Sequence, residues 1–245
     1  MSIFESKLNL KQNESAPSYR YILMPGQVPM NFPHVHLHNK AFKYWRSFWT
    51  DVFNEISPGE KVRDSDFYRQ KWIAVLMDEQ QIVALHLYSF FNLDSDAALA
   101  TEYLASNYTI EDQNVLEAKG IRSVMSMEYL TIDPQYQRGK KTSLPISILM
   151  IGLGYRVLQD SGYDSMIAPC RCDVKVDKKA ELFGAIELRS PFMLHGVPVR
   201  NMVTPASRIK SHPDRGIQLL INQHWQRREY LLDSESKQRL SQIAS

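Results

Sequence analysis

The chain has 245 residues, of which 44% are hydrophobic and 23% are charged, and its net charge at pH 7 is +2. These proportions are typical of a folded globular domain and exclude a disordered chain. The small net charge also excludes a strong overall field that would draw the protein onto nucleic acid or an anionic membrane.

Neither a membrane span nor a secretion signal is recognisable. No run of 18 or more apolar residues occurs, and the N-terminal stretch MSIFESKLNLKQNES has no apolar core. The two cysteines, Cys170 and Cys172, are one residue apart, a spacing that fits neither a disulfide framework nor a four-ligand zinc site. We therefore expect a cytoplasmic protein with no integral membrane association.

The first half of the chain predicts a strand, a helix and a hairpin. Residues 1–17 are polar and are expected to form a flexible arm, followed by a short strand at 19–24. From His38 to Ile56 apolar residues recur every three or four positions, which indicates an amphipathic helix. Residues 71–90 hold two apolar runs around a polar turn and predict a β-hairpin, and 93–119 predict a helical insert.

The centre of the chain predicts a strand and a buried helix. Residues 122–133 are expected to be a strand. Residues 142–160 are apolar on almost every side, which favours a buried helix with Thr142 or Ser143 as its N-cap and Pro145 in its first turn.

The remainder alternates again between strands and helices. We expect, in chain order, a strand at 164–170, a helix at 176–186, a hairpin at 192–203 that turns at His195-Gly196, and a helix at 216–232. Residues 18–210 would then form one domain, and residues 211–245 a C-terminal helix and tail packed on that domain.

A basic loop joins the central strand to the buried helix. It contains Arg138, Gly139, Lys140 and Lys141. The free N–H groups and the positive end of the dipole at a helix start attract phosphate, and adjacent cations add to that attraction. The loop predicts a pyrophosphate or phosphopantetheine site, with an ordinary surface turn of solvated lysines as the alternative.

The stretch EYLTIDPQYQRGKKTSLPISIL, residues 128–149, resembles motif A of the GNAT (GCN5-related N-acetyltransferase) superfamily. In that motif a strand ending in Asp-Pro leads into an Arg/Gln-x-x-Gly-x-Gly/Ala loop at a helix start. Here Arg138 takes the first position, Lys141 the first glycine and Ser143 the second. The order of the predicted elements extends the resemblance to about residues 19–204.

This resemblance implies an α/β (α+β) fold: the GNAT-like acyl-CoA N-acyltransferase fold, with a central mixed, mostly antiparallel twisted sheet flanked by helices. In that fold the strands before and after the central helix splay apart, and the pantetheine of an acyl donor lies between them. Residues 128–133 and 165–170 would form the two walls. The implied donor contacts are Leu130, Thr131, Ile132, Arg138, Gly139, Lys140, Lys141, Thr142 and Ser143.

Within the superfamily, the helical insert and the aromatic first helix resemble the acyl-homoserine-lactone synthases and the N-acyl amino acid synthases. Phe48 and Trp49 on that helix would border the acyl or acceptor pocket, near the acidic segment 63–67. An arginine expected on the third strand is replaced by His86 or Leu87. This departure favours a relative of the lactone synthases over a true member.

Glu128 is the candidate general base, because it lies on the strand that would adjoin the thioester and a carboxylate can accept the proton of an ammonium. A structural strand glutamate is the alternative. Backbone N–H groups near Leu130 to Ile132 would stabilise the oxyanion. Phe183 stands where many GNAT enzymes carry an acidic tyrosine, which leaves Tyr129, Tyr155 or solvent to protonate the leaving thiolate.

Two further patterns have structural and functional interpretations. His34, His36 and His38 alternate, so a strand would place them on one face as a metal site, whereas a polar loop edge needs no metal. Cys170 could be a nucleophile, but no histidine stands beside it in sequence, which favours a small core residue and no metal or covalent chemistry.

The sequence therefore predicts an N-acyltransferase that moves a medium or long acyl group from acyl carrier protein or acyl-CoA to the amine of a small molecule such as an amino acid. Two alternatives stay open: an acetyl-CoA-dependent acetyltransferase of a small amine or a protein lysine, and a catalytically degenerate GNAT-fold binding protein. A homodimer is compatible with the sequence, and no nucleic-acid partner is expected.

Overall fold

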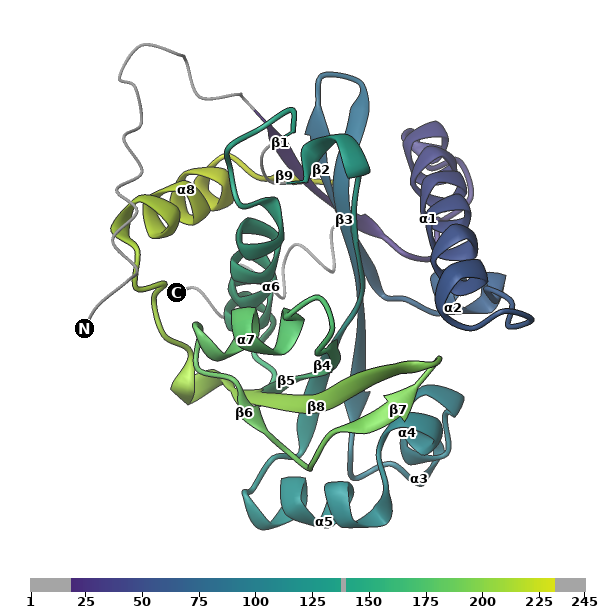
Figure 1. Ribbon diagram of the computed structural model, residues 1–245, viewed down its shortest axis with the longest axis vertical. Coiled ribbons are helices and arrows are strands. Elements are labelled where there is room, and N and C mark those ends of the chain that lie inside the picture. The colour runs from purple at the N-terminus through teal and green to yellow at the C-terminus, as the bar shows by residue number, and fades with distance from the viewer. Residues whose placement is uncertain (1–18, 138–139, 232–245) are drawn as a thin grey trace.

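The computed structural model describes residues 19–137 and 140–231 (Figure 1). Its strands are β1 Arg20–Pro25, β2 Trp72–Asp78, β3 Gln81–Asn92, β4 Ser123–Ile132, β5 Ser165–Arg171, β6 Ile186–Glu187, β7 Phe192–Leu194, β8 Val197–Pro205 and β9 Glu229–Tyr230. Its helices are α1 Val35–Ile56, α2 Asp64–Tyr68, α3 Asp96–Leu99, α4 Glu102–Asn107, α5 Ile110–Ala118, α6 Ile146–Ser161, α7 Val176–Glu181 and α8 Arg215–Gln226.

The described strands form one twisted sheet in the order β6-β8-β5-β4-β3-β2-β1-β9, and β7 pairs with β8 beside this path. Of the described strand pairs, β4–β5 and β1–β9 are parallel and the others are antiparallel. Helices α6, α7 and α8 cover one face, and α1 and α2 cover the other (Figure 1). The mixed, mostly antiparallel sheet flanked by helices that the sequence predicts is confirmed.

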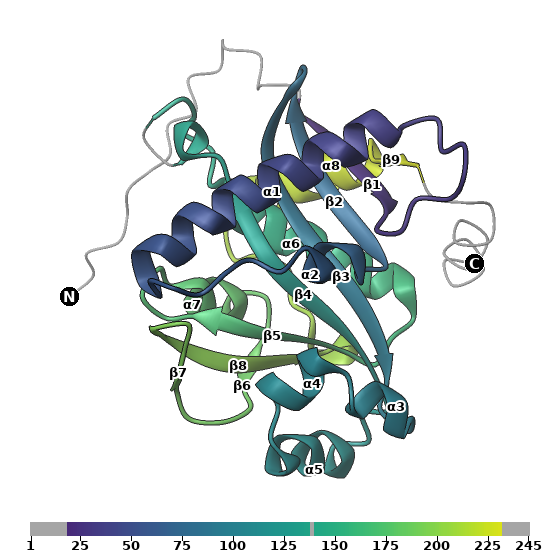
Figure 2. The same ribbon diagram turned by 90° about the vertical axis from the view of Figure 1, so that its right-hand side faces the viewer.

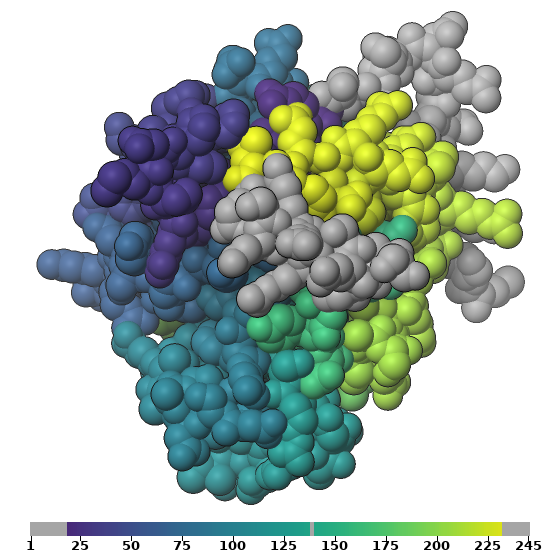
Figure 3. Space-filling model, turned by 180° about the vertical axis from the view of Figure 1, so that it is seen from behind, coloured from purple at the N-terminus to yellow at the C-terminus, as the bar shows by residue number. Residues whose placement is uncertain are grey.

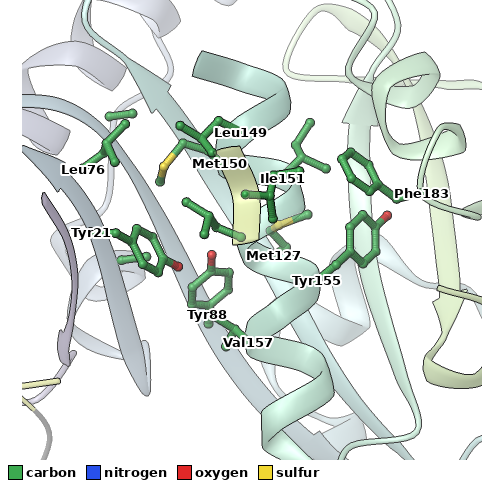
Figure 4. Packing of buried hydrophobic residues seen from close by; sticks show 14 of the residues in the cluster. Tyr21, Leu76, Tyr88, Met127, Leu149, Met150, Ile151, Tyr155, Val157 and Phe183 are labelled. Atoms are coloured by element: carbon green, nitrogen blue, oxygen red, sulfur yellow. The ribbon is translucent and has the colours of Figure 1, made fainter. Parts of the chain in front are cut away.

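Alternating side chains on the central strands fill two cores. Tyr21, Leu76 and Met127 face α6, whereas Ile22 and Val75 face α1, as the two-residue period of a strand requires. Figure 4 shows side chains of α6 packed between the sheet and Phe183. Helix α1 crosses the opposite face diagonally (Figure 2).

The predicted hairpins and the central strand are confirmed, but several helix boundaries differ. Helix α1 begins at Val35, so His36 and His38 lie on a helix, and the strand arrangement considered for a histidine metal site is wrong. Helix α7 ends at Glu181, short of residue 186. Helix α8 ends at Gln226, because Glu229 and Tyr230 pair with β1.

The start of the buried helix also needs correction. Helix α6 begins at Ile146 with Pro145 as its N-cap, and neither Thr142 nor Ser143 caps it. The reason is steric, because a proline disfavours the helical conformation of the residue before it, here Leu144. The helix ends as expected at Gly162, whose φ of +71° is left-handed.

The helical insert α3–α5 gathers at one end of the molecule, away from α8 (Figure 3). It joins the rest of the chain through its own small core, in which Phe91 of β3 stacks on Tyr103 of α4 at 5.7 Å between ring centroids. The amide Nδ2 of Asn201 on β8 also donates to the carbonyl of Asn107 at 2.6 Å. The insert is thereby held against the β4, β5 and β8 part of the sheet.

Among residues 19–137 and 140–231, no helix combines the length and the apolar character that crossing a membrane requires. The arm expected at residues 1–17 and the last residues of the expected C-terminal tail lie outside the described residues.

The β7–β8 hairpin docks onto the end of α1. Its turn is formed by His195 and Gly196, with φ of 48° and 74°. The imidazole of His195 packs on Phe53 at 4.9 Å and its Nδ1 lies 2.5 Å from Oε1 of Glu60. A Cβ on Gly196 would lie 2.2 Å from the carbonyl oxygen of Ile56.

Gly196→Ala is therefore expected to lower the free energy of unfolding more than Gly120→Ala does. Both glycines have a left-handed φ, of 74° and 72°, but a Cβ on Gly120 meets nothing within 4 Å. Gly120→Ala should lower the free energy of unfolding by about 1–2 kcal/mol, because alanine disfavours the left-handed backbone conformation. Gly196→Ala should lower it by about 1–3 kcal/mol more, because its Cβ also overlaps the carbonyl oxygen of Ile56. Urea unfolding measures the free energy of unfolding of both variants. Equal decreases would show that the β7–β8 hairpin shifts to accommodate the Cβ without steric strain.

Candidate active site

A cavity of about 780 Å³ opens where β4 and β5 separate. These strands pair in parallel from Val124–Ser165 to Ser126–Ile167 and no further. Beyond this point the edges of β4 and β5 that face one another have no strand partner in the described sheet. The strands splay as expected from the sequence, but the predicted wall of residues 165–170 is only partly correct, because Ser165–Ile167 pair with β4 and the separation begins after Ser126 and Ile167.

The cavity is lined from both faces of the sheet. One part is apolar and lies against α6 and α7, with Met127, Ile148, Ile151, Met166 and Ala180 among its lining residues. The other part lies between α1, α2 and α4, where charged side chains such as Arg69 and Glu128 face the mostly aromatic and aliphatic side chains of α1. The gap between the strands therefore connects an apolar compartment with a charged compartment.

A β-bulge on β4 decides which side chains reach the charged compartment. Leu87 pairs with Glu128 and Leu85 with Thr131, so two residues of β4, Tyr129 and Leu130, stand opposite one residue of β3. Tyr129 has a φ of 54°, which is rare for a residue other than glycine. The bulge places the consecutive side chains of Glu128 and Tyr129 on the same face.

Glu128 lies at the centre of a buried hydrogen-bond network. Its side chain is 4% exposed and forms a two-point ion pair with Arg69. Ser126 Oγ donates to it at 2.5 Å and Gln70 Nε2 at 3.4 Å. Burial raises the pKa of the Glu128 carboxyl, and the charge of Arg69 and these hydrogen bonds oppose that rise.

Asp66 links this network to the aromatic residues of α1. The hydroxyl of Tyr129 donates to Asp66 at 2.7 Å, and Arg69 Nε lies 3.4 Å from the same carboxylate. Trp49 packs edge-on against the Tyr129 ring at 5.0 Å, and its Nε1 donates to Thr131 Oγ1 at 2.9 Å. Burial and the negative charge of Asp66 raise the pKa of Tyr129, so its phenol stays protonated.

The charged compartment has an excess of carboxylates. Asp66, Glu102 and Glu128 line it together with two guanidinium groups, Arg63 and Arg69. Arg63 pairs with Glu102 and Arg69 with Glu128, while Asp66 lies near both guanidinium groups. This excess is local, because over the whole lining four carboxylates, with Glu55 included, stand against four cations, with Arg171 and Lys179 included. Around Asp66, Glu102 and Glu128 it favours a cationic group such as an ammonium.

His86 lies on the opposite side of the sheet, where it lines the cavity near α6. Its ring is 2% exposed, and its Nδ1 has no hydrogen-bond partner among the described residues. Burial lowers the pKa of His86 to about 3, so the imidazole is neutral at physiological pH.

Several residues singled out in the sequence meet at this cavity and others do not. Glu128, Leu130, Ile132, Phe48 and Trp49 line it. Thr131 bonds to Trp49 and is not among the lining residues. The loop residues Lys140, Lys141, Thr142 and Ser143 also lie outside the lining, and Arg138 and Gly139 lie outside the described residues.

Lys141 is engaged away from the cavity. Its ammonium donates to the hydroxyl of Tyr136 and lies 3.4 Å from Asp78. It also lies 4.4 Å from the centre of the Tyr136 ring. Lys141 thus ties the loop to the β2–β3 hairpin.

The remaining candidates have structural partners. His38 Nε2 lies 2.9 Å from the carbonyl of Gly26, in a buried contact. Cys170 is buried, and burial raises the pKa of its thiol, which disfavours the thiolate. Within the described residues no group of three or more histidine, cysteine, aspartate or glutamate side chains is arranged to hold a metal ion. Phe183 packs on Tyr155 at 5.2 Å, and the Tyr155 hydroxyl lies 3.0 Å from Thr204 Oγ1.

Sequence reasoning missed Arg69 and the wall formed by the insert. Arg69 follows Asp66 by three residues at the end of α2, and this spacing is the one signal that could have paired them. The insert contributes Glu102, Tyr103 and Ser106 to the cavity. Arg69 lies 4.8 Å above the Tyr103 ring, a contact between segments that nothing in the sequence relates.

No protein-family model matches the chain, and no curated protein matches it. Solved structures with a similar fold include FeeM, an N-acyl amino acid synthase from uncultured soil microbes. It is 13% identical, with a TM-score of 0.53, and the match covers 79% of this chain and 94% of that one.

Two further structures show the range of similar proteins. The CoA-dependent acyl-homoserine lactone synthase BjaI, solved with SAM and isopentyl-CoA, has a TM-score of 0.55 at 10% identity and covers 92% of this chain and 99% of its own. An agmatine N-acetyltransferase has a TM-score of 0.50 at 14% identity, with coverages of 76% and 99%. The GNAT-like fold expected from the sequence is confirmed.

The buried ion pair predicts strong energetic coupling between Arg69 and Glu128. Arg69→Met alone should lower the free energy of unfolding by about 3–5 kcal/mol, because it leaves a buried carboxylate unpaired. Adding Glu128→Gln should restore part of that loss. A denaturant-unfolding double-mutant cycle measures the coupling, with the exposed Arg122→Met as a control expected to cost less than about 1 kcal/mol. Additive effects would contradict the coupling.

The neutral His86 predicts acid sensitivity. The unfolded chain protonates this histidine below about pH 6.5, whereas the folded protein does so only near pH 3, so stability is complete above pH 6.5 and falls as the pH decreases. When the pH is lowered from 6.5 to 5.0, the free energy of unfolding of wild type should fall by about 2 kcal/mol more than that of His86→Gln. Parallel pH profiles of unfolding free energy for the two proteins would show that His86 does not remain neutral.

Proposed function

We propose that the protein is an N-acyltransferase that moves a medium or long acyl group from acyl-CoA or acyl carrier protein to the amine of a small molecule such as an amino acid. The observation that carries this proposal is the cavity between the splayed strands β4 and β5, with Glu128 on its wall. The GNAT-like fold supports it, because this cavity occupies the place where the resemblance puts the acyl donor.

The apolar compartment supports an acyl chain longer than acetyl. Its walls carry aliphatic side chains of α6 and β5 such as Ile151 and Met166, so a hydrocarbon chain would bury against apolar surface. The phosphate end of the donor is proposed to lie at the entrance to α6, where Ile146, Ser147 and Ile148 line the cavity. Beyond the last β4–β5 pair, backbone groups of Leu130, Thr131 and Ile132 would form hydrogen bonds with the pantetheine, and their N–H groups would donate to the thioester oxygen.

The charged compartment supports an amine acceptor. Its net negative charge, from Asp66, Glu102 and Glu128 against two arginines, would hold the acceptor as an ammonium. FeeM is an N-acyl amino acid synthase, which makes an amino acid a reasonable first acceptor to test.

The proposed reaction needs no covalent enzyme intermediate. Glu128, directly or through a water molecule, takes a proton from the ammonium, and the free amine attacks the thioester carbonyl carbon. Backbone N–H groups of β4 near Leu130 to Ile132 stabilise the resulting oxyanion. The nitrogen of the tetrahedral intermediate then gives its second proton to solvent, the carbon–sulfur bond breaks to leave the amide, and the leaving thiolate takes a proton from solvent.

Glu128→Gln should reduce kcat about 10²–10⁴-fold, because an amide cannot accept the proton. The measurement is release of free thiol from octanoyl-, palmitoyl- and acetyl-CoA in the presence of a panel of amino acids and other small amines. Glu117→Gln, on the exposed surface of α5, is the control and should leave the rate unchanged. Thermal unfolding of both variants separates loss of chemistry from loss of fold.

The same assay decides between the candidate functions. Preference for octanoyl- or palmitoyl-CoA supports the proposed reaction, and preference for acetyl-CoA favours an acetyltransferase. Tight binding of a thioester without thiol release from any donor would identify a binding protein. Full activity of Glu128→Gln would exclude Glu128 as the base.

A further inference from the structure

Helix α7 directs one lysine into the cavity. Val176, Lys179 and Ala180 recur at three- and four-residue spacing, the spacing of one helix face, and all three line the cavity. Val176 and Ala180 pack against the core around α6. The neighbouring Lys178 points away, and its ammonium lies 2.8 Å from Glu181 on the surface.

Lys179 has no carboxylate partner within salt-bridge distance in the described part of the chain. Its ammonium has one hydrogen bond, to the carbonyl of Val174 at 3.4 Å. The guanidinium groups that line the same cavity are all paired, Arg171 with Asp173 and the other two with the carboxylates of the charged compartment. Burial lowers the pKa of Lys179, as expected for an ammonium that loses water without gaining a counter-ion.

The position of Lys179 follows from the topology. β4 and β5 run parallel and separate toward their C-terminal ends, where β4 leads toward α6 and β5 leads into α7. The first turn of α6, with Ile146, Ser147 and Ile148, lines the same cavity as Lys179. No side chain caps the N-terminus of α6, so its positive end faces this mouth without a side-chain acceptor.

The lysine of the basic loop does not supply this charge. Lys141 is held by Asp78 and Tyr136 and is not part of the cavity lining. Lys179 is the cavity-lining cation of the described chain that lacks a carboxylate within salt-bridge distance.

We propose that Lys179 binds the phosphate of a pantetheine donor at the mouth of the β4–β5 gap. This assignment rests on the proposed function and adds a residue that the sequence motif does not contain. A phosphate ester would give the partly buried ammonium its missing counter-ion and would accept charge-assisted hydrogen bonds. CoA and a carrier protein both present the same 4′-phosphopantetheine group.

Calorimetric titration of the full chain with pantetheine and with 4′-phosphopantetheine tests the contact. Wild type should bind the phosphorylated compound at least about 10-fold more tightly. Lys179→Met should lose most of this preference while keeping its affinity for pantetheine, and Lys179→Arg should retain part of it. Lys178→Met is the matched control, one residue away on the same helix, and should behave as wild type. The melting temperature of Lys179→Met should be unchanged or higher, because an unpaired charge has been removed.

The results separate failure of this contact from failure of the proposed function. If wild type binds neither compound, the proposed donor class is wrong and Lys179 has no phosphate to bind. If Lys179→Met keeps the full preference for phosphate, the Lys179 assignment is overturned and the acyltransferase proposal stands. Competition with CoA and with a holo carrier protein identifies the source, and a weakened response of Lys179→Met to either one supports the contact.

Discussion

β4 and β5 pair over three residues and then separate, and the candidate site depends on this separation. Continuous pairing would bring the two strands to about 4.8 Å and close the sheet. Because they part after Ser126 and Ile167, the cavity passes between the two faces of the sheet, where α6 and α7 lie on one side and α1 and α2 on the other. The apolar and the charged compartment are connected for this reason.

The bulge at Tyr129 determines how the charged compartment is built. In a regular strand Glu128 and Tyr129 would point to opposite faces. With Tyr129 in a left-handed conformation, both side chains reach the α2 side, where Arg69 pairs with Glu128 and Asp66 accepts from Tyr129. A buried ion pair of this kind adds little net stability to the fold, although removing one partner is strongly destabilising. Its presence is therefore easier to explain by the site than by folding.

The helical insert completes the compartment from outside the central motif. It brings Tyr103 beneath Arg69 and places Glu102 beside Arg63. Its attachment to β8 through Asn107 and Asn201 fixes this wall relative to β5. A change in the insert would therefore alter the charged compartment while leaving the apolar compartment against α6 intact.

The sequence by itself determined most of the elements, because apolar periodicity, prolines and glycines act over neighbouring residues, and its resemblance to the GNAT superfamily implied the fold class. It identified the two hairpins, the strand containing Glu128 and the buried helix that ends at Gly162. Only the tertiary structure decided that Arg69 pairs with Glu128, that Tyr129 adopts the bulge, that Lys141 is held by Asp78 and that Lys179 faces the cavity. Most of these features depend on contacts between segments far apart in the chain. The left-handed conformation of Tyr129 occurs at a residue that is not glycine, so the sequence gives no sign of it. Local patterns carry no information about either.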